Sequence, residues 1–264
     1  MATRLDWDPR QYDSVRPRPP GALLDALAQW AGGGVEHVLD LGCGTGLSTR
    51  AWVGRANEIV GVDPSDRMRS YAQELGGAGV RYVTGTSVAT GLPQGWADVA
   101  TCSQSLHWMD PEPTFAEVAR VLRPGGVFAA YDYEPPPFVH PEVDAAFADV
   151  VARLNASRPA TARPRAAKAG HADSMRASGR FAFVRELGFH SVETAGADRL
   201  TRLAGSFGHY SRLLEAGASE EELGLGALRR VADRVLGTGE VPMWIGYRVR
   251  LGVTPGPELD QPPM

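Results

Sequence analysis

The chain has 264 residues, of which 43% are hydrophobic and 22% are charged, and its formal net charge is −4 at pH 7. The length suits one large domain, or a domain with a smaller cap, and the apolar fraction is sufficient for a full core. The negative charge argues against a general nucleic-acid-binding protein, and the sequence has no run of about 18 apolar residues that would predict a membrane span.

Apolar periodicity in the first half of the chain predicts helices that alternate with strands. A first helix is expected over 19–31, where leucines share one face after two prolines. Strands are expected over 35–41, 58–63, 80–84, 97–102 and 127–133, and helices between them over 47–54, 66–75 and 113–122. This alternation predicts a parallel sheet with helices on both faces.

The second half begins with three prolines at 135–137, which are expected to end the fifth strand and to open an insert that reaches 178. Within the insert, a helix is expected over 141–154 and a loop over 155–170. A strand over 183–194, helices near 198–203, 207–214 and 220–236, and a last strand with alternating apolar residues over 243–253 follow. The tail 254–264 contains four prolines and is expected to lack regular structure.

The segment VLDLGCGTG at 38–46 is the most informative part of the sequence. An apolar strand that leads into a glycine-rich turn and a helix predicts exposed N–H groups at the start of that helix, where polar ligand groups can bind. Asp40 lies inside the apolar run, where an unpaired carboxylate is costly, so a cationic or hydrogen-bonding ligand would offset the cost. The second strand ends at Asp63, where an acid suits the two hydroxyls of a ribose.

Four motifs in order make the sequence resemble the class I S-adenosylmethionine-dependent methyltransferases, in particular the methyltransferase type 11 group. VLDLGCGTG matches the first motif, GVDPSDRM the second, ADVATC the fourth strand, and VARVLRPGGVF the following helix, turn and fifth strand. The alternative is a dinucleotide-binding Rossmann domain, but its G-x-G-x-x-G fingerprint requires a glycine where this chain has Thr49. The resemblance covers about residues 35–132.

The resemblance implies an α/β fold with a Rossmann-like, doubly wound, seven-stranded sheet, mostly parallel with an antiparallel last strand, and a helical lid insert. It divides the chain into five parts. These are an arm and helix over the cofactor (1–34), the cofactor-binding core (35–134), the lid insert (135–180), strands and helices that complete the sheet and the cap (181–253), and the tail (254–264).

The cofactor that the resemblance implies is S-adenosylmethionine, with S-adenosylhomocysteine as the product. The glycine-rich loop would pass beneath its methionine part, Asp40 would hold the ammonium, and Asp63 would bind the ribose. The acid that the family usually places after the third strand is absent, and a hydroxyl of Thr86 or Ser87, or a backbone carbonyl, is the expected substitute. The other residues expected at the cofactor are Gly42, Cys43, Gly44, Gly46, Pro64, Met68 and Ser103.

The segment before the first helix also resembles part of the family, because a tyrosine is followed by an Arg-Pro pair. Tyr12 and Arg16 are therefore candidates for contact with the cofactor carboxylate. The alternative is an ordinary surface arm, since arginine is abundant in this chain.

The acceptor site is expected after the fourth strand, where Gln-x-x-His-Trp at 104–108 recurs in the branch that resembles trans-aconitate methyltransferases. His107 suits a base or an orienting donor, and Trp108 a wall. The alternative for His107 is a cap on the next helix. Other candidates for contact with the substrate are Tyr133, His171, His209 and Tyr210.

The segment 153–180 carries seven basic residues and one acid. A lid that attracts an anionic acceptor would explain this excess. A solvated loop is the preferred explanation, because Lys168 is the only lysine among 27 basic residues and arginine is common throughout the chain.

These features together predict a cytoplasmic methyltransferase that acts on a small molecule through a carboxylate, hydroxyl or amine. The two cysteines lack metal-ligand spacing, so a metal is not expected, and the absence of a secretory signal favours the reducing cytoplasm. The alternatives are an RNA or protein methyltransferase, and a cofactor-binding homologue that no longer methylates. A monomer or a homodimer is expected, without nucleic acid or membrane as a partner.

Overall fold

The computed structural model describes residues 8–157, 168–207 and 210–256. The chain divides into two compact units. The sheet unit comprises 18–132, 165–189 and 247–264, and the helical unit comprises 1–17, 133–164 and 190–246. The segment 135–180, expected as one insert, contributes to both units.

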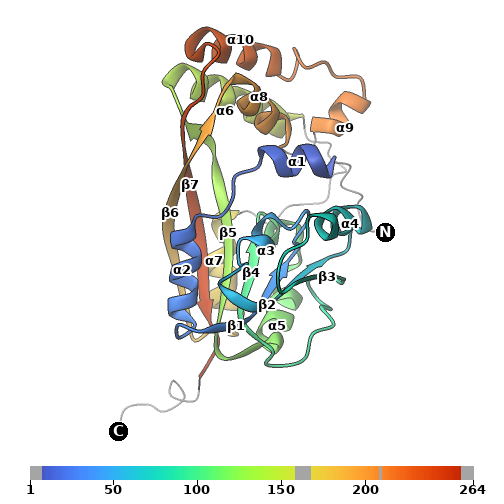
Figure 1. The fold of residues 1–264 in the computed structure, drawn as a ribbon, viewed down its shortest axis with the longest axis vertical. Coiled ribbons are helices and arrows are strands. Elements are labelled where there is room, and N and C mark those ends of the chain that lie inside the picture. The colour runs from blue at the N-terminus through green and yellow to red at the C-terminus, as the bar shows by residue number, and fades with distance from the viewer. Residues whose placement is uncertain (1–7, 158–167, 208–209, 257–264) are drawn as a thin grey trace. The chain divides into compact units, whose positions relative to one another are not determined.

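A seven-stranded sheet has the order β3-β2-β1-β4-β5-β7-β6 (Figure 1). β1, β2, β3, β4 and β5 pair in parallel. Gly125 N donates to Pro255 O at 3.2 Å and Thr254 N donates to Gly126 O at 3.0 Å, so the chain at the end of β7 runs antiparallel to the start of β5. The predicted fold class is therefore confirmed. The strands are β1 (Val35–Leu41), β2 (Ala56–Asp63), β3 (Val80–Thr84), β4 (Ala97–Ser103), β5 (Leu122–Phe138), β6 (Phe183–Ala195) and β7 (Val241–Val253).

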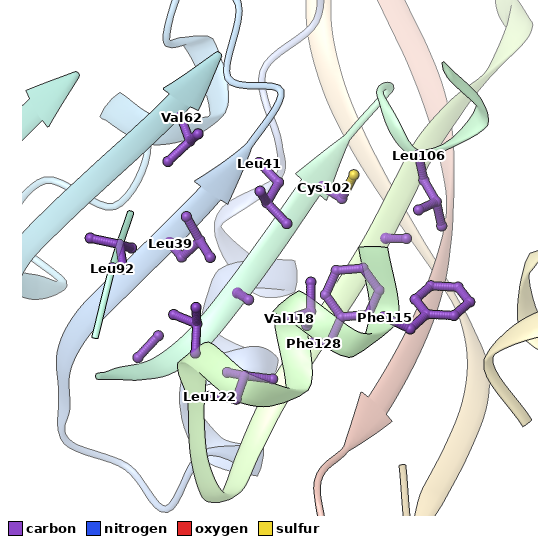
Figure 2. Close-up of a cluster of buried hydrophobic side chains, with 14 of the residues drawn as sticks. Leu39, Leu41, Val62, Leu92, Cys102, Leu106, Phe115, Val118, Leu122 and Phe128 are labelled. Carbon is purple, nitrogen blue, oxygen red and sulfur yellow. The ribbon is translucent and has the colours of Figure 1, made fainter. Parts of the chain in front are cut away.

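The sheet unit buries one face of its strands beneath helix α5 (Figure 2), and Met175 of α7 belongs to the same cluster of buried side chains. Alternate residues such as Leu39 and Leu41 of β1 pack with Phe115 of α5 and Met175 of α7. Since side chains alternate across a strand, Asp40 points to the opposite face. The helical elements of this unit are α2 (Gly21–Trp30), α3 (Leu47–Arg50), α4 (Asp66–Leu75), η1 (Leu106–Trp108), α5 (Pro111–Val121), η2 (Lys168–Gly170) and α7 (His171–Ala177).

The helical unit has its own apolar contacts. Helix α10 contacts α6 and α8, and α1 contacts α8. Phe147 of α6, Leu203 of α8 and Leu228 of α10 are buried. The helices of this unit are α1 (Pro9–Val15), α6 (Pro141–Ala156), α8 (Ala197–Gly205), α9 (Tyr210–Glu215) and α10 (Leu225–Leu236).

Several predicted boundaries are wrong, among them those of α3, α10 and β5. Helix α3 ends at Arg50 rather than at residue 54, and α10 begins at Leu225 rather than at residue 220, after Gly224 in a left-handed conformation (φ 85°). β5 continues through the three prolines to Phe138. These prolines lie beyond Ser103↔Tyr131, the last pair of β5 with β4, so their missing N–H groups do not weaken that pairing.

The expected loop 155–170 and tail 254–264 lie largely outside the described residues. Helix α6 extends to Ala156, and η2 follows the gap. In the described part of the chain, no helix combines the length and the apolar character that a membrane span requires.

Candidate functional site

The glycine-rich loop connects β1 to α3 at the carboxyl edge of the sheet. Gly42, Gly44 and Gly46 all have positive φ angles (65°, 54° and 79°), which favour glycine. A Cβ on Gly42 would lie 2.7 Å from Cβ of Ser105, and one on Gly46 would collide with Tyr82. A Cβ on Gly44 would meet nothing within 4 Å. Gly42 and Gly46 are thus packed against protein, whereas Gly44 faces open space.

Asp63 joins the end of β2 to this loop. Its Oδ2 accepts a hydrogen bond from Gly44 N at 3.0 Å, and its Oδ1 accepts one from Ser65 N at 2.8 Å. Burial raises the pKa of Asp63, and the two backbone donors partly oppose this effect. The structure therefore brings together the loop and the acid that the sequence predicted as neighbours.

Asp40 is fully buried on β1 behind the loop. Its two carboxylate oxygens accept hydrogen bonds from Thr49 Oγ1 of α3 at 2.7 Å and from Thr101 Oγ1 of β4 at 2.8 Å. Burial raises the pKa of Asp40 to about 6, and the hydroxyl donors limit the increase. The carboxylate thus fastens α3 to the sheet.

A tyrosine on β5 extends this polar layer. The hydroxyls of Tyr131 and Ser48 are hydrogen-bonded, and the side chain of Ser103 also bonds Tyr131. Burial raises the pKa of Tyr131, so its phenol stays protonated. Sequence reasoning missed Thr49 and Thr101 as members of this layer. The signal for Thr101 was its polar side chain inside an apolar strand at the register of Asp40.

Two side chains of the loop, those of Thr45 and Cys43, indicate which chemistry the loop supports. Thr45 is 1% exposed, and its Oγ1 has no hydrogen-bond partner among the described residues. A buried hydroxyl without a partner is costly, so the Thr45 hydroxyl is a candidate to bind a polar group of a ligand. Burial raises the pKa of Cys43 well above its usual value, so its thiol is not a nucleophile at neutral pH.

The residues expected around the adenine differ in exposure. Pro64 and Thr86 are exposed, and Met68 is buried. Ser87 Oγ accepts a hydrogen bond from Thr114 Oγ1 of α5 at 2.9 Å. Of the two hydroxyls proposed to replace the missing acid, that of Thr86 is thus the more exposed to solvent.

A second polar group lies after β4 and at the end of the sheet-unit part of β5. Lys168 Nζ is 2.7 Å from Asp132 Oδ1 and donates to Gln104 Oε1 at 2.9 Å. His107 is buried, with Nδ1 at 3.9 Å from the same Asp132 oxygen, and its ring lies 5.2 Å from that of Trp108. Among the described non-glycine residues, only Gln104 has a positive φ (53°), a sparsely populated conformation that is typical of functional sites.

Arg250 of β7 pairs with the other oxygen of Asp132 at 2.8 Å and with Glu186 Oε1 of β6 at 3.2 Å. His171, at the start of α7, is 1% exposed. Burial lowers the pKa of His171; the charges of Arg250 and Lys168 add to this effect, while Asp132 opposes it. The structure thus groups two predicted residues, His107 and His171, around an aspartate that was not predicted.

Five other predicted residues belong to the helical unit or lie outside the described residues. The Arg16 guanidinium hydrogen-bonds the Tyr133 hydroxyl and the Ser206 carbonyl, and it stacks 4.6 Å from the centre of the Tyr12 ring. Tyr210 donates to Glu220 Oε1 at 2.9 Å. His209 lies outside the described residues. Within the described residues, no group of three or more His, Cys, Asp or Glu side chains could hold a metal ion.

Comparison with known proteins shows similarity over the part of the chain that carries the loop. Residues 39–130 match the family model described as a methyltransferase domain. An uncharacterized methyltransferase of Mycobacterium tuberculosis is 37% identical over 115 residues, which cover 44% of this chain and 46% of the relative. The trans-aconitate 2-methyltransferase of Acidovorax ebreus is 34% identical over 130 residues, which cover 47% of this chain and 48% of the relative. The chain thus spans about half the length of these curated relatives.

A solved structure is similar over more of the chain. A candidate type II methyltransferase from Anaeromyxobacter dehalogenans superposes with a TM-score of 0.70 at 28% identity, over 91% of this chain and 99% of that one. The YcgJ protein of Bacillus subtilis, at 21% identity and a TM-score of 0.53, shares the fold.

Proposed function

We propose that this chain, whose residues 39–130 match the family model described as a methyltransferase domain, transfers a methyl group from S-adenosylmethionine to a small-molecule acceptor. The observation that carries the proposal is the open space at Gly44, in a loop that Asp63 holds from the neighbouring strand. The orphaned Thr45 hydroxyl in the same loop fits a polar ligand.

The chain's residues divide into those that hold the cofactor and those that face the reaction. The loop 42–46 and Asp63 bind the cofactor, and Asp40 acts behind the loop through the threonines that accompany it. When bound, S-adenosylmethionine supplies a methyl carbon on a positively charged sulfur, and the C–S electron pair stays with sulfur as S-adenosylhomocysteine forms. The protein's contribution is to hold the acceptor atom in line with that carbon.

His107 has a role that depends on the acceptor. A hydroxyl acceptor must lose a proton, and His107 beside Asp132 would take it. A carboxylate acceptor is already deprotonated, so His107 would then orient it by donating a hydrogen bond. In both cases a new bond to the methyl carbon forms as the bond to sulfur breaks.

Calorimetry and product analysis test the proposal. We expect the purified protein to bind S-adenosylmethionine and S-adenosylhomocysteine with micromolar affinity, and to release S-adenosylhomocysteine when incubated with a set of small organic acids and alcohols that includes trans-aconitate. If neither nucleoside gives a measurable heat of binding, the proposal is overturned. Binding without product in the whole set would favour the homologue that no longer methylates.

The pKa of Asp40 predicts how cofactor binding depends on pH. Burial raises this pKa to about 6, so Asp40 is mostly protonated below that pH. Because the ammonium of the cofactor requires an ionised Asp40, binding below pH 6 must also remove this proton. We therefore expect the affinity for S-adenosylhomocysteine to be constant above pH 7 and to fall by up to tenfold per pH unit below about 6. Asp63, whose pKa is also raised, acts in the same direction.

A variant separates the contribution of Asp40. Thr101→Val removes a donor that favours the ionised carboxylate, so it should move the midpoint of the decline to higher pH. Calorimetry from pH 5 to 8 measures both proteins. An affinity that stays flat across this range would contradict the role of Asp40.

A further inference from the structure

Two cations share the carboxylate of Asp132 in the sheet unit. Lys168 Nζ lies 2.7 Å from one oxygen and Arg250 Nη1 lies 2.8 Å from the other. Arg250 is also shared with Glu186, whose side chain is 43% exposed. The negative charge of Asp132 is therefore offset within the protein. Lys168, whose side chain is 40% exposed, can serve a second negative group.

His171 carries an unsatisfied atom beside this ion cluster. Its side chain is 1% exposed, and Nε2 has no hydrogen-bond partner among the described residues. An unpaired buried polar group is destabilising, because it has lost its hydrogen bonds to water. Burial lowers the pKa of His171, so the ring is neutral at pH 7 and one nitrogen carries a proton. A neutral ring that donates from Nε2 needs an oxygen acceptor.

We propose that Lys168 and His171 bind a carboxylate of the acceptor, which makes the substrate a small organic acid. The proposal rests on the proposed function, because it names the substrate class of that reaction. A carboxylate has two oxygens, one for the ammonium and one for the imidazole N–H. A protonated amine has no acceptor atom for either donor, and a single hydroxyl would satisfy only one of the two groups.

The choice of lysine at 168 agrees with this role. Lys168 is the only lysine of a chain whose other basic side chains, histidine aside, are arginines. An ammonium is a compact charge with three donors that can serve several acceptors at once, whereas a guanidinium favours one flat, two-pronged partner. Lys168 already bridges Asp132 and Gln104.

A single lysine also provides a single reporter. Full-length protein labelled with ¹³Cε,¹⁵Nζ-lysine should give one side-chain signal, from Lys168. We expect succinate, added at constant ionic strength to protein saturated with S-adenosylhomocysteine, to shift this signal with a millimolar dissociation constant. Chloride should leave it unchanged, and His171→Leu should weaken succinate binding at least fivefold.

Calorimetry with succinate keeps the test decisive if His171→Leu does not fold. Lys168→Met should abolish succinate binding, and Arg176→Met, which removes an exposed cation from the same segment, should not. A signal that succinate moves no more than chloride overturns the inference, and so does tighter binding of inorganic phosphate than of succinate. Binding of S-adenosylhomocysteine is measured separately, so its loss would refute the proposed function and not the carboxylate site.

Discussion

Replacing Gly44 with valine is expected to weaken S-adenosylhomocysteine binding at least about 100-fold, which corresponds to ~2.7 kcal/mol. The added side chain would project into the open space where no protein atom lies within 4 Å. It would occupy the path of the ligand over the loop, and it would disturb the N–H that Gly44 donates to Asp63. Calorimetry on the folded variant measures the loss.

Gly54 provides the matched control. It too has a positive φ (77°) and open space where a Cβ would lie, but it belongs to the turn between α3 and β2. Both substitutions impose the strain of a left-handed side chain, about 1–2 kcal/mol of stability. Gly54→Val should therefore destabilise the protein by a similar amount and bind S-adenosylhomocysteine as the parent does. Equal binding losses in both variants would show that strain, and not the ligand path, explains the result.

The sheet could be predicted from the sequence because its strands carry strong local signals. β1 and β3 have the predicted bounds, and the parallel order follows from helices that separate buried apolar runs. The boundaries that were predicted wrongly depend on contacts with neighbouring elements of the fold. The prolines of β5 would normally stop a strand, and they are accommodated because β4 has already ended.

The parts of the candidate site that depend on local sequence could be predicted. Positive φ at three glycines and an acid at the end of β2 are local features, and the structure brings them together. The polar groups that satisfy Asp40 could not be assigned, because Thr49 and Thr101 come from different elements and only the fold makes them neighbours.

Asp132 shows a signal that was present and not used. Like Asp40, it is an acid within an apolar run, near the end of the strand predicted over 127–133, where burial demands a partner. Its partners Lys168 and Arg250 lie on η2 and β7, at long sequence separations, so the sequence alone does not pair them. The buried acid in an apolar run was thus informative at both positions.

Removal of Arg250 tests how strongly this buried pair holds the sheet unit. Its side chain is 2% exposed and that of Asp132 is 7% exposed, so neither charge is well solvated. Breaking a buried ion pair from one side leaves a charge without its partner, and Arg250→Met is expected to lower the free energy of unfolding by about 3 kcal/mol. Lys168 remains on Asp132 and keeps the loss at the lower end of the range for buried pairs. Urea denaturation measures the change.

A double variant and a surface ion pair serve as controls for the stability loss expected of Arg250→Met. Asp132→Leu combined with Arg250→Met removes both charges, so it should be less destabilising than the sum of the single changes by at least about 1 kcal/mol. Arg176→Met breaks a pair with Asp173 whose side chains are 51% and 84% exposed. That surface change should cost no more than about 1 kcal/mol. Equal losses for Arg250→Met and Arg176→Met would mean that the Asp132 pair is no stronger than a solvated one, and that the acid is held by other contacts.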